Sequence, residues 1–367
     1  MTDALDESWC GDALDGGRVT MLSTEFERVS LPLADAFTIS RGTQEVAENV
    51  VVRITDDEGR TGVGSAAPAA HYGETPETVE AVLPELLAVV EAVDDPHATD
   101  RIERELRGVV EDNPAARAAV DVALHDLSAK RLNVPLYRQW GLAPERVPKT
   151  SFTIGLGTTE QMREKTRSAV AEGYDIVKVK LGTDRDEEIV AAVREEAPDA
   201  RIRVDANEAW TPREAVQMTE RLDAYDVEFV EQPVPASDPE SLKFVYERSP
   251  LPIAADESCV TLPDVPAVAD RTDIVNLKLM KTGGLDEATR MIHTARAHGL
   301  EVMLGCMIET NASIAAACHL APLVDYADLD GALLLANDEY TGIPTEGSEI
   351  RLADCDRPGT GARRSES

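Results

Sequence analysis

The chain has 367 residues, of which 43% are hydrophobic and only 4% aromatic, so a large core must be built from aliphatic side chains. Acidic residues number 69 against 36 lysines and arginines, and the resulting net charge of −33 excludes the basic surface that a nucleic-acid-binding protein needs. No run of residues is long and apolar enough to span a bilayer.

Only eight lysines are present. An acidic and lysine-poor composition is typical of a halophilic protein, because at about 1 M salt the Debye length falls to roughly 3 Å and screens the repulsion between acids. An ordinary acidic protein is the alternative. The five cysteines lack metal-ligand spacing, and the N-terminus lacks the pattern of a signal peptide. We therefore expect free thiols and a cytoplasmic location.

Residues 1–20 are acidic and Gly-rich, and we expect them to form a disordered extension. Strand signals follow between residues 21 and 65, at Met21–Ser30 and Asn49–Thr55. Helical periodicity then begins, with Pro76 and Pro114 at the first turns of two helices. This order of elements predicts an α+β domain over residues 21–145.

Short apolar strands alternate with amphipathic helices between residues 146 and 335, which predicts an α/β fold with a (β/α)8-type (TIM-like) barrel. A doubly wound open sheet is the alternative, but its Gly-rich phosphate loop is missing. Residues 336–367 return to strand and turn composition and are expected to fold back onto the N-terminal domain. The expected barrel strands are Ser151–Gly155, Asp175–Leu181, Ile202–Asn207, Glu228–Gln232, Pro252–Glu257, Ile274–Leu279, Glu301–Met307 and Tyr326–Asp330.

Three acids stand at matching positions near the ends of consecutive expected strands: Asp205, Glu231 and Asp256. Catalytic groups of such barrels lie at the carboxyl ends of the strands, so these carboxylates would meet at one mouth and repel one another. A hard divalent cation removes that conflict, and Mg²⁺ suits a few carboxylates together with substrate and water. The alternative is that each acid caps the helix that follows it.

Half of the lysines fall in two short segments, Val177–Leu181 and Leu277–Lys281. Lysine can act as a base where arginine cannot, because its pKa shifts readily. Lys178 and Lys180 share one face of a strand, and we expect each to lower the other's pKa. Strands two and six are roughly opposite in an eight-stranded barrel, so Lys180 and Lys278 are expected to flank a substrate. Surface lysines that pair with acids are the alternative.

The segments Lys178-Val179-Lys180, Asp205-Ala206-Asn207, Glu231-Gln232-Pro233 and Asp256-Glu257-Ser258, together with Lys278, resemble the muconate-lactonizing enzyme subgroup of the enolase superfamily. The helix over residues 118–126 and the tail Pro358–Gly361 resemble further family segments. The resemblance implies that Asp205, Glu231 and Asp256 bind Mg²⁺ and that Lys180 and Lys278 are the acid/base pair. It also implies that Lys178 helps to hold a substrate carboxylate, and that residues 21–65 belong to a capping domain that closes the barrel mouth.

The chain is most similar to the dipeptide epimerases of this subgroup. Asp328 and Asp330 resemble their Asp-x-Asp motif, which holds the ammonium group of the dipeptide, and the segment around Met307 also resembles theirs. The resemblance implies inversion of the C-terminal α-carbon through an enediolate by two lysines. Muconate cycloisomerase, o-succinylbenzoate synthase and N-acyl amino acid racemase are alternatives, but they give the two aspartates no role. A catalytically inactive barrel is a further alternative for the protein as a whole. For Asp328 and Asp330 alone, the alternative is that they cap a helix or a turn.

Side-chain preference depends on the loops over the mouth. Arg41 lies where the family places specificity residues and is expected to bind substrate, although the family's glutamate-reading arginine aligns nearer Gly42. Glu74 either favours a cationic side chain or only begins a helix. We expect a dipeptide or a related carboxylate as the small-molecule partner, with no nucleic acid or membrane, and a possible homo-oligomer.

Overall fold

The computed structural model describes residues 22–365, so the extension expected over residues 1–20 lies outside the described part. The chain begins with an antiparallel sheet of three strands in the order β1-β2-β3. These are β1 (Ser23–Ile39), β2 (Gly42–Thr55) and β3 (Thr61–Ala66). Helices α1 (Pro76–Val93), α2 (Thr99–Val109), α3 (Pro114–Leu132) and α4 (Leu136–Gln139) follow.

Two glycines of β3 let α3 lie directly on the sheet. A Cβ at Gly62 or Gly64 would come within 2.1 Å of the carbonyl oxygen of Ala123 or Ala119, so only glycine permits this approach. The alanine-rich face of α3 and the apolar face of β2 therefore pack into one core with little aromatic content. Small side chains supply contact area through close packing rather than through volume.

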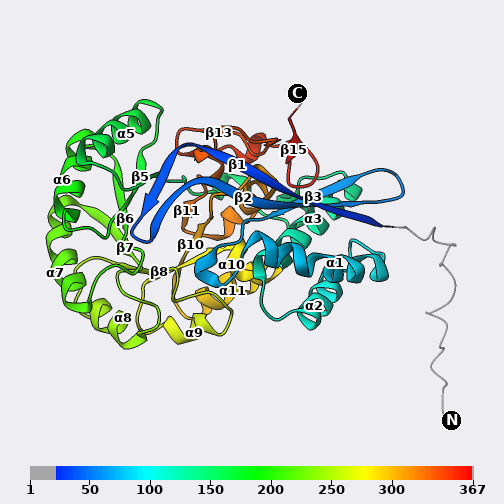
Figure 1. The fold of residues 1–367 in the computed structure, drawn as a ribbon, viewed down its shortest axis with the longest axis horizontal. Coiled ribbons are helices and arrows are strands. Elements are labelled where there is room, and N and C mark those ends of the chain that lie inside the picture. Colours follow the sequence, from blue (N-terminus) through cyan, green and yellow to red (C-terminus); the bar gives the residue numbers. More distant parts are fainter. Residues whose placement is uncertain (1–21, 366–367) are drawn as a thin grey trace, which may run out of the picture.

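The hairpin of β1 and β2 is longer than the sequence predicted. It extends from the capping helices across the barrel towards β5, with its turn at Ser40 and Arg41 (Figure 1). Its outer half is exposed on much of its surface, so it lacks the apolar alternation that marks a half-buried strand. Backbone pairing holds this half together, from Phe37 opposite Gln44 to Ile39 opposite Gly42.

Eight parallel strands form the second sheet, in the order β11-β10-β9-β8-β7-β6-β5-β4, and a bridge between Thr150 and Ala327 closes it into a barrel. The predicted fold class is therefore confirmed. The strands are β4 (Phe152–Ile154), β5 (Ile176–Lys180), β6 (Arg201–Asp205), β7 (Val227–Glu231), β8 (Ile253–Ala255), β9 (Ile274–Lys278), β10 (Glu301–Gly305) and β11 (Tyr326–Asp328).

Helices cover the outside of the barrel (Figure 1). After the eighth strand the structure has the short 3-10 helix η5 (Gly331–Leu334) in place of an α-helix, because the chain leaves the barrel there and pairs Leu335 with Leu33 of the hairpin. The helices are α5 (Thr159–Ala171), α6 (Asp186–Glu196), α7 (Pro212–Leu222), α8 (Pro239–Tyr246), α9 (Asp264–Val268), α10 (Leu279–Thr282), α11 (Leu285–Ala297) and α12 (Asn311–Leu320).

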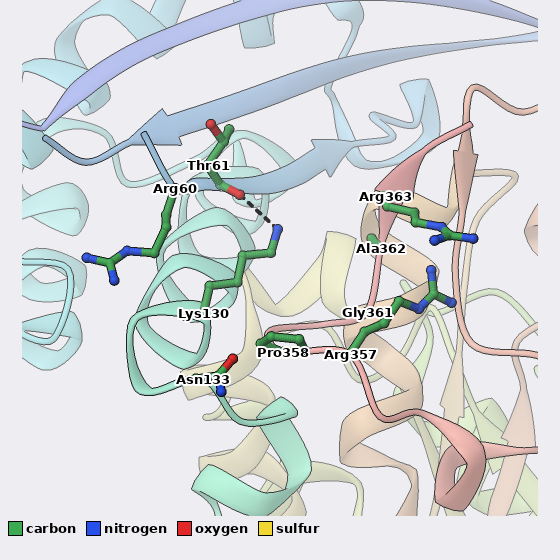
Figure 2. A pocket seen from close by; sticks show the side chains of 9 residues that line it. All are labelled: Arg60, Thr61, Lys130, Asn133, Arg357, Pro358, Gly361, Ala362 and Arg363. Carbon is green, nitrogen blue, oxygen red and sulfur yellow. Dashed lines mark hydrogen bonds between the residues drawn. The ribbon is translucent and has the colours of Figure 1, made fainter. Parts of the chain in front are cut away.

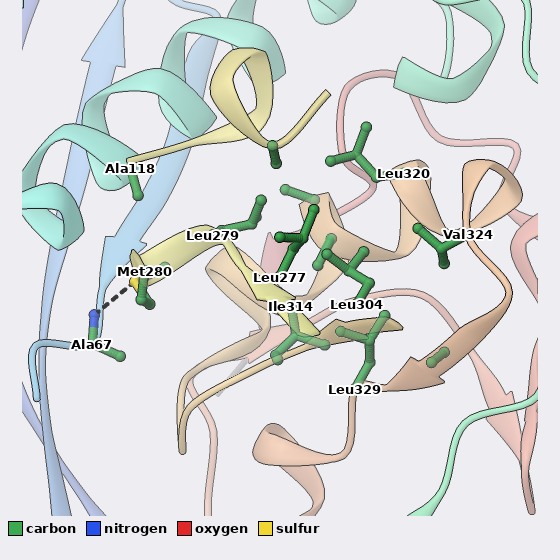
Figure 3. Close-up of a cluster of buried hydrophobic side chains, with 14 of the residues drawn as sticks. Ala67, Ala118, Leu277, Leu279, Met280, Leu304, Ile314, Leu320, Val324 and Leu329 are labelled. Carbon is green, nitrogen blue, oxygen red and sulfur yellow. Dashed lines mark hydrogen bonds between the residues drawn. The ribbon is translucent and has the colours of Figure 1, made fainter. Parts of the chain in front are cut away.

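A continuous apolar core joins the barrel to the capping helices. Figure 3 shows Leu277 and Leu304 of the barrel strands beside Ile314 of α12, with Met280 reaching towards Ala67 of the capping domain. The Sδ atom of Met280 accepts a hydrogen bond from the Ala67 amide at 3.2 Å. This core fixes the capping domain against the strand that carries Lys278.

The C-terminal segment contacts the capping helices. It contains the short strands β12 (Tyr340–Thr341), β13 (Thr345–Glu346), β14 (Glu349–Ile350) and β15 (Arg363–Arg364). The Gly359 carbonyl accepts from Leu136 N at 2.8 Å, and the buried Asp126 of α3 accepts from Thr360 N at 2.7 Å. Among residues 22–365, no helix is both long and apolar enough to cross a membrane.

Candidate active site

The inner face of the barrel changes character along the strands. Its lower part is mainly apolar, with Phe229, Ala254, Ile274 and Met303 in one buried cluster and the buried Arg203 stacked over Phe229. Two residues further along, the side chains on the same face are polar, because residues i and i+2 of a strand share a side. Glu231 follows Phe229 in this way and Asp256 follows Ala254, so ionisable groups gather at the carboxyl ends of the strands.

The three acids predicted to bind metal meet at this end. One carboxylate oxygen from each of Asp205, Glu231 and Asp256 lies within 4.8 Å of the others, and all three residues are buried. Burial raises the pKa of Glu231 to about 7, and the neighbouring Asp205 adds to the rise. Its buried Oε2 forms an ion pair with Lys178 but has no hydrogen bond of regular geometry within residues 22–365. Three buried carboxylates that converge on one point are a donor set that fits Mg²⁺, so we assign the ligand role to these residues as a proposal.

Each acid has a lysine beside it. Lys180 Nζ lies 2.6 Å from Asp205 Oδ2, and Lys278 Nζ lies 2.7 Å from Asp256 Oδ2. Lys178 Nζ lies 2.7 Å from Glu231 Oε2. Strands β5 and β9 are four positions apart in either direction around the closed sheet, so the lysines approach the acids from opposite sides.

The pKa shift expected for the paired lysines is wrong for Lys178. Burial pulls the pKa of Lys178 down, but Asp328, Glu231 and Asp205 outweigh it and hold the pKa well above its usual value. Burial also lowers the pKa of Lys278, but Asp256 outweighs this effect and raises the pKa overall. The prediction considered only the neighbouring lysine, whereas carboxylates on three other strands surround the amine.

Two residues that the sequence did not single out for the site position its acids. Asn276 Nδ2 donates to Glu231 Oε1 at 2.8 Å. Lys281 Nζ is buried and contacts Asp256 Oδ1 at 2.6 Å, as well as backbone carbonyls of Asp256, Cys259 and Asn276. A signal for Asn276 exists in the sequence, since it precedes Lys278 by two residues and therefore shares its face.

Asp328 ends β11 and Asp330 lies two residues beyond it, and the two aspartates have different partners. Asp328 accepts from Lys178 at 2.7 Å and from the Ser151 hydroxyl at 2.6 Å, and burial is outweighed by Lys178, so its pKa falls to about 2. Asp330 accepts from the Thr153 amide at 2.6 Å, and burial together with Asp328 raises its pKa to about 7. Excess negative charge therefore remains at this side of the barrel, opposite β7.

A cavity of about 620 Å³ lies over these groups, between the barrel mouth and the capping domain. Its lining residues include Lys178, Lys180, Lys278, Asp328, Asp330, Met307 and Arg41. The predicted site residues that border it thus come from both domains. Glu74 also lines it, but its Oε1 accepts from the Ala115 amide at 3.0 Å and so caps α3, whereas the helix that follows Glu74 in the sequence is α1.

Arg41, expected to bind substrate, is already paired with protein acids. Its guanidinium lies 2.8 Å from Glu257 Oε1 and 3.3 Å from Glu208 Oε2, and it donates to the Asn207 carbonyl at 3.2 Å. Burial lowers the pKa of Arg41, but Glu257 outweighs this and raises it overall. Arg41 thus fastens the tip of the β1–β2 hairpin to the ends of β6 and β8.

Comparison with known proteins agrees with this geometry. Residues 21–141 match the N-terminal domain model of mandelate racemase and muconate lactonizing enzyme, and residues 161–367 match the model described as enolase C-terminal domain-like. The chain belongs to the enolase superfamily. This membership confirms the resemblance stated from the sequence, and it places the barrel and the capping sheet within the superfamily's two-domain plan.

The chain is also similar to individual members of the superfamily that are named as epimerases. The L-Ala-D/L-Glu epimerase of Bacteroides thetaiotaomicron is 39% identical over 95% of this chain and 89% of its own length. The hydrophobic dipeptide epimerase of Roseobacter litoralis is 37% identical over 93% of this chain and 98% of its own. A structure of the Enterococcus faecalis dipeptide epimerase with Mg and L-Leu-L-Tyr has a TM-score of 0.86, 32% identity and coverage of 92% and 98%.

Proposed function

We propose that the protein is a Mg²⁺-dependent dipeptide epimerase, an isomerase that inverts the α-carbon of the C-terminal residue. The observation that carries the proposal is the placement of Lys180 and Lys278 on opposite strands, on either side of three convergent carboxylates. The relatives that align with most of this chain and most of their own length support it. An inversion needs one group to remove the proton from one face and another to return it to the other face.

Asp205, Glu231 and Asp256 would hold Mg²⁺, which supplies positive charge beside the substrate carboxylate as that group becomes more negative during proton removal. The lysines perform the proton transfers. Lys180 or Lys278, in its neutral form, takes the α-proton, and the other, as an ammonium, protonates the enediolate from the opposite side. A cation held by Asp205, Glu231 and Asp256 would offset the negative charge that raises the pKa of Lys278 and so allow its neutral form. Lys178 remains an ammonium, because the acids around it favour that form, and pairs with the substrate carboxylate.

The position of the acids on the barrel supports one direction for the substrate. The carboxylate end lies near Glu231 on β7, and the α-carbon lies between β5 and β9. The free amino group then points towards β11, which stands opposite β7. Asp328 and Asp330 offer negative charge there, as the ammonium group of a dipeptide requires, whereas a second substrate carboxylate would be repelled.

We further propose a preference for apolar side chains over glutamate at the inverted residue. The arginines that border the cavity are already paired, Arg41 with Glu257 and Glu208, and Arg28 with Glu48 and Glu77. A carboxylate side chain would have to displace one of these acids. The lining also offers apolar side chains, Phe37, Ile39, Val46 and Pro68 from the capping domain and Ile308 and Leu334 from the ends of the barrel strands.

The test is incubation of the protein and Mg²⁺ with a dipeptide library in D₂O, followed by mass spectrometry and chiral analysis. We expect one deuterium at the C-terminal α-carbon together with inversion, greatest for apolar C-terminal residues. Exchange confined to N-acyl amino acids would favour the racemase alternative. A glutamyl residue turned over faster than leucine or phenylalanine would overturn the side-chain preference but leave the epimerase assignment intact.

The working conditions are also part of the proposal. A net charge of −33 and the scarcity of lysine support function in a salt-rich cytoplasm, where acidic groups repel one another less. The free energy of unfolding should then increase as KCl is raised towards about 1 M. Loss of stability with added KCl would contradict the halophilic assignment.

We also propose that the protein forms a homo-oligomer, which sedimentation would test.

A further inference from the structure

A second cavity, of about 490 Å³, lies apart from the active site, where the start of β3, the end of α3 and the C-terminal segment meet (Figure 2). Four of its lining residues are cationic and none is acidic, in a chain whose acids outnumber its cations by 69 to 36. The lining residues are Arg60, Thr61, Lys130, Asn133, Arg357, Pro358, Gly361, Ala362 and Arg363.

Two of the four cations already have partners. Lys130 Nζ lies 2.7 Å from Asp126 Oδ2 and donates to the Thr61 carbonyl at 2.8 Å. Arg60 pairs with Asp56 at 2.9 Å and with Glu58 at 3.0 Å. Figure 2 shows the Arg60 guanidinium directed away from the other three cations. These charges are offset within the protein, and they do not require a ligand.

The other two cations, Arg357 and Arg363, have no carboxylate within ion-pair distance among residues 22–365. Arg357 Nη2 donates to the Gly342 carbonyl at 2.8 Å, but its Nη1 is buried without a hydrogen-bond partner in that part of the chain. A buried N–H group of a charged side chain costs free energy when it is left unpaired. A ligand with oxygen acceptors would remove this cost.

Long-range electrostatics does not account for an anion site on this molecule. A net charge of −33 repels anions from the surface as a whole, so an anion that binds must be held by local contacts. Guanidinium groups match the oxygens of phosphate in geometry and donate two hydrogen bonds at once. Two unpaired guanidinium groups balance the two negative charges of a phosphate monoester.

We propose that this cavity binds a small phosphorylated molecule, with Arg357 and Arg363 donating to its phosphate group. The volume of about 490 Å³ leaves room for an organic portion beside the phosphate, in the size range of small-molecule sites. No residue of this lining borders the active-site cavity, so the proposal is independent of the epimerase assignment.

The experiment measures binding of inorganic phosphate to the full chain by isothermal titration calorimetry at constant ionic strength. We expect saturable binding at one site. Arg363→Gln should weaken it roughly tenfold or more, since a hydrogen bond to a charged group contributes on that scale. The Arg357→Gln/Arg363→Gln double variant should abolish saturation. Arg363 is the primary target because its side chain has no partner among the described residues whose loss would disturb the fold.

Arg364→Gln is the matched control. Arg364 adjoins Arg363 on β15 but pairs with Glu339 at 2.7 Å and does not line the cavity. We expect its phosphate affinity to equal that of the natural chain. Absence of saturable binding to the natural chain would overturn the proposal. So would equal affinities for the natural chain and Arg363→Gln, or an equal loss in Arg363→Gln and Arg364→Gln.

Discussion

Lys180 and Lys278 stand on strands β5 and β9, which are separated by three strands on each side of the closed barrel. Each amine contacts a different acid, Asp205 for Lys180 and Asp256 for Lys278, and Glu231 comes from the strand midway between them. A substrate whose carboxylate binds a cation held by these acids would place its α-carbon between the two amines.

Asp330→Asn should raise the KM for dipeptides roughly tenfold or more, with a smaller effect on kcat. Removing the charge that faces a substrate ammonium leaves that cation poorly compensated in a buried site. Steady-state kinetics with a free dipeptide and its N-acetylated form would check this. The acetylated compound carries no ammonium, so its KM should change little; an equal rise for both compounds would contradict the assigned role.

The same residue predicts a pH effect on substrate binding. Burial, with Asp328, raises the pKa of Asp330 to about 7, so the carboxyl group becomes neutral as the pH falls through that value. Only the ionised form attracts an ammonium group. The KM for a free dipeptide should therefore increase between pH 8 and 6, and this dependence should be weaker in Asp330→Asn. Parallel pH profiles for the two proteins would be evidence against it.

Gly305→Ala should weaken Mg²⁺ binding by about 10–100-fold, as changes around metal ligands commonly do. A Cβ at this position would lie 2.6 Å from Asn276 Oδ1, and Asn276 holds Glu231 by its amide. Calorimetric titration with Mg²⁺ measures the effect. Gly108→Ala is the control, since its Cβ would meet no atom within 4 Å. Equal Mg²⁺ affinity in a folded Gly305→Ala protein would refute the positioning role.

Much of the fold could be predicted because its signals are local. Most barrel strands are short apolar runs with an acid or a lysine near the end, and the structure places strands where these runs occur. The outer part of the β1–β2 hairpin could not be predicted in this way. It is held by pairing between its own strands, and Arg41 at its tip gives no sign that its partners lie on two distant loops.

The convergence of the candidate site residues could be predicted, but their electrostatics could not. Carboxylates and lysines near strand ends can be recognised in the sequence as site candidates, because such positions in a barrel converge. The pKa of Lys178 was mispredicted because Asp328 and Glu231 come from strands far away in sequence. Lys281 ends one of the two lysine-rich segments, but only the three-dimensional structure shows that its amine holds Asp256.

Protonation of His319 should reduce the stability of the protein in mild acid. Its Nδ1 accepts from the Tyr137 amide at 2.9 Å, its Nε2 lies 3.0 Å from the Thr360 carbonyl, and burial lowers its pKa to about 4. Between this value and about 6.5 the unfolded chain binds a proton that the folded chain does not. Stability should therefore fall, by roughly 3 kcal/mol at most, as pH decreases from about 6.5 to 4.

Urea unfolding at constant salt across this pH range would measure the effect of His319. His319→Gln keeps a donor and an acceptor but does not titrate, so its free energy of unfolding should decline less steeply. The other titrating groups are the same in the two proteins. If the natural chain and His319→Gln show parallel pH dependence, the account of the buried histidine is wrong.

The central claim is tested most directly by α-proton exchange in D₂O catalysed by Lys180→Ala and Lys278→Ala, followed by proton NMR with each C-terminal epimer of one dipeptide. Each variant should lose epimerisation, by roughly 10²–10⁴-fold or more, yet exchange the α-proton of a single epimer through the remaining lysine. The account predicts that the two variants act on opposite epimers. Exchange of the same epimer by both variants, or undiminished epimerisation by either, would contradict it.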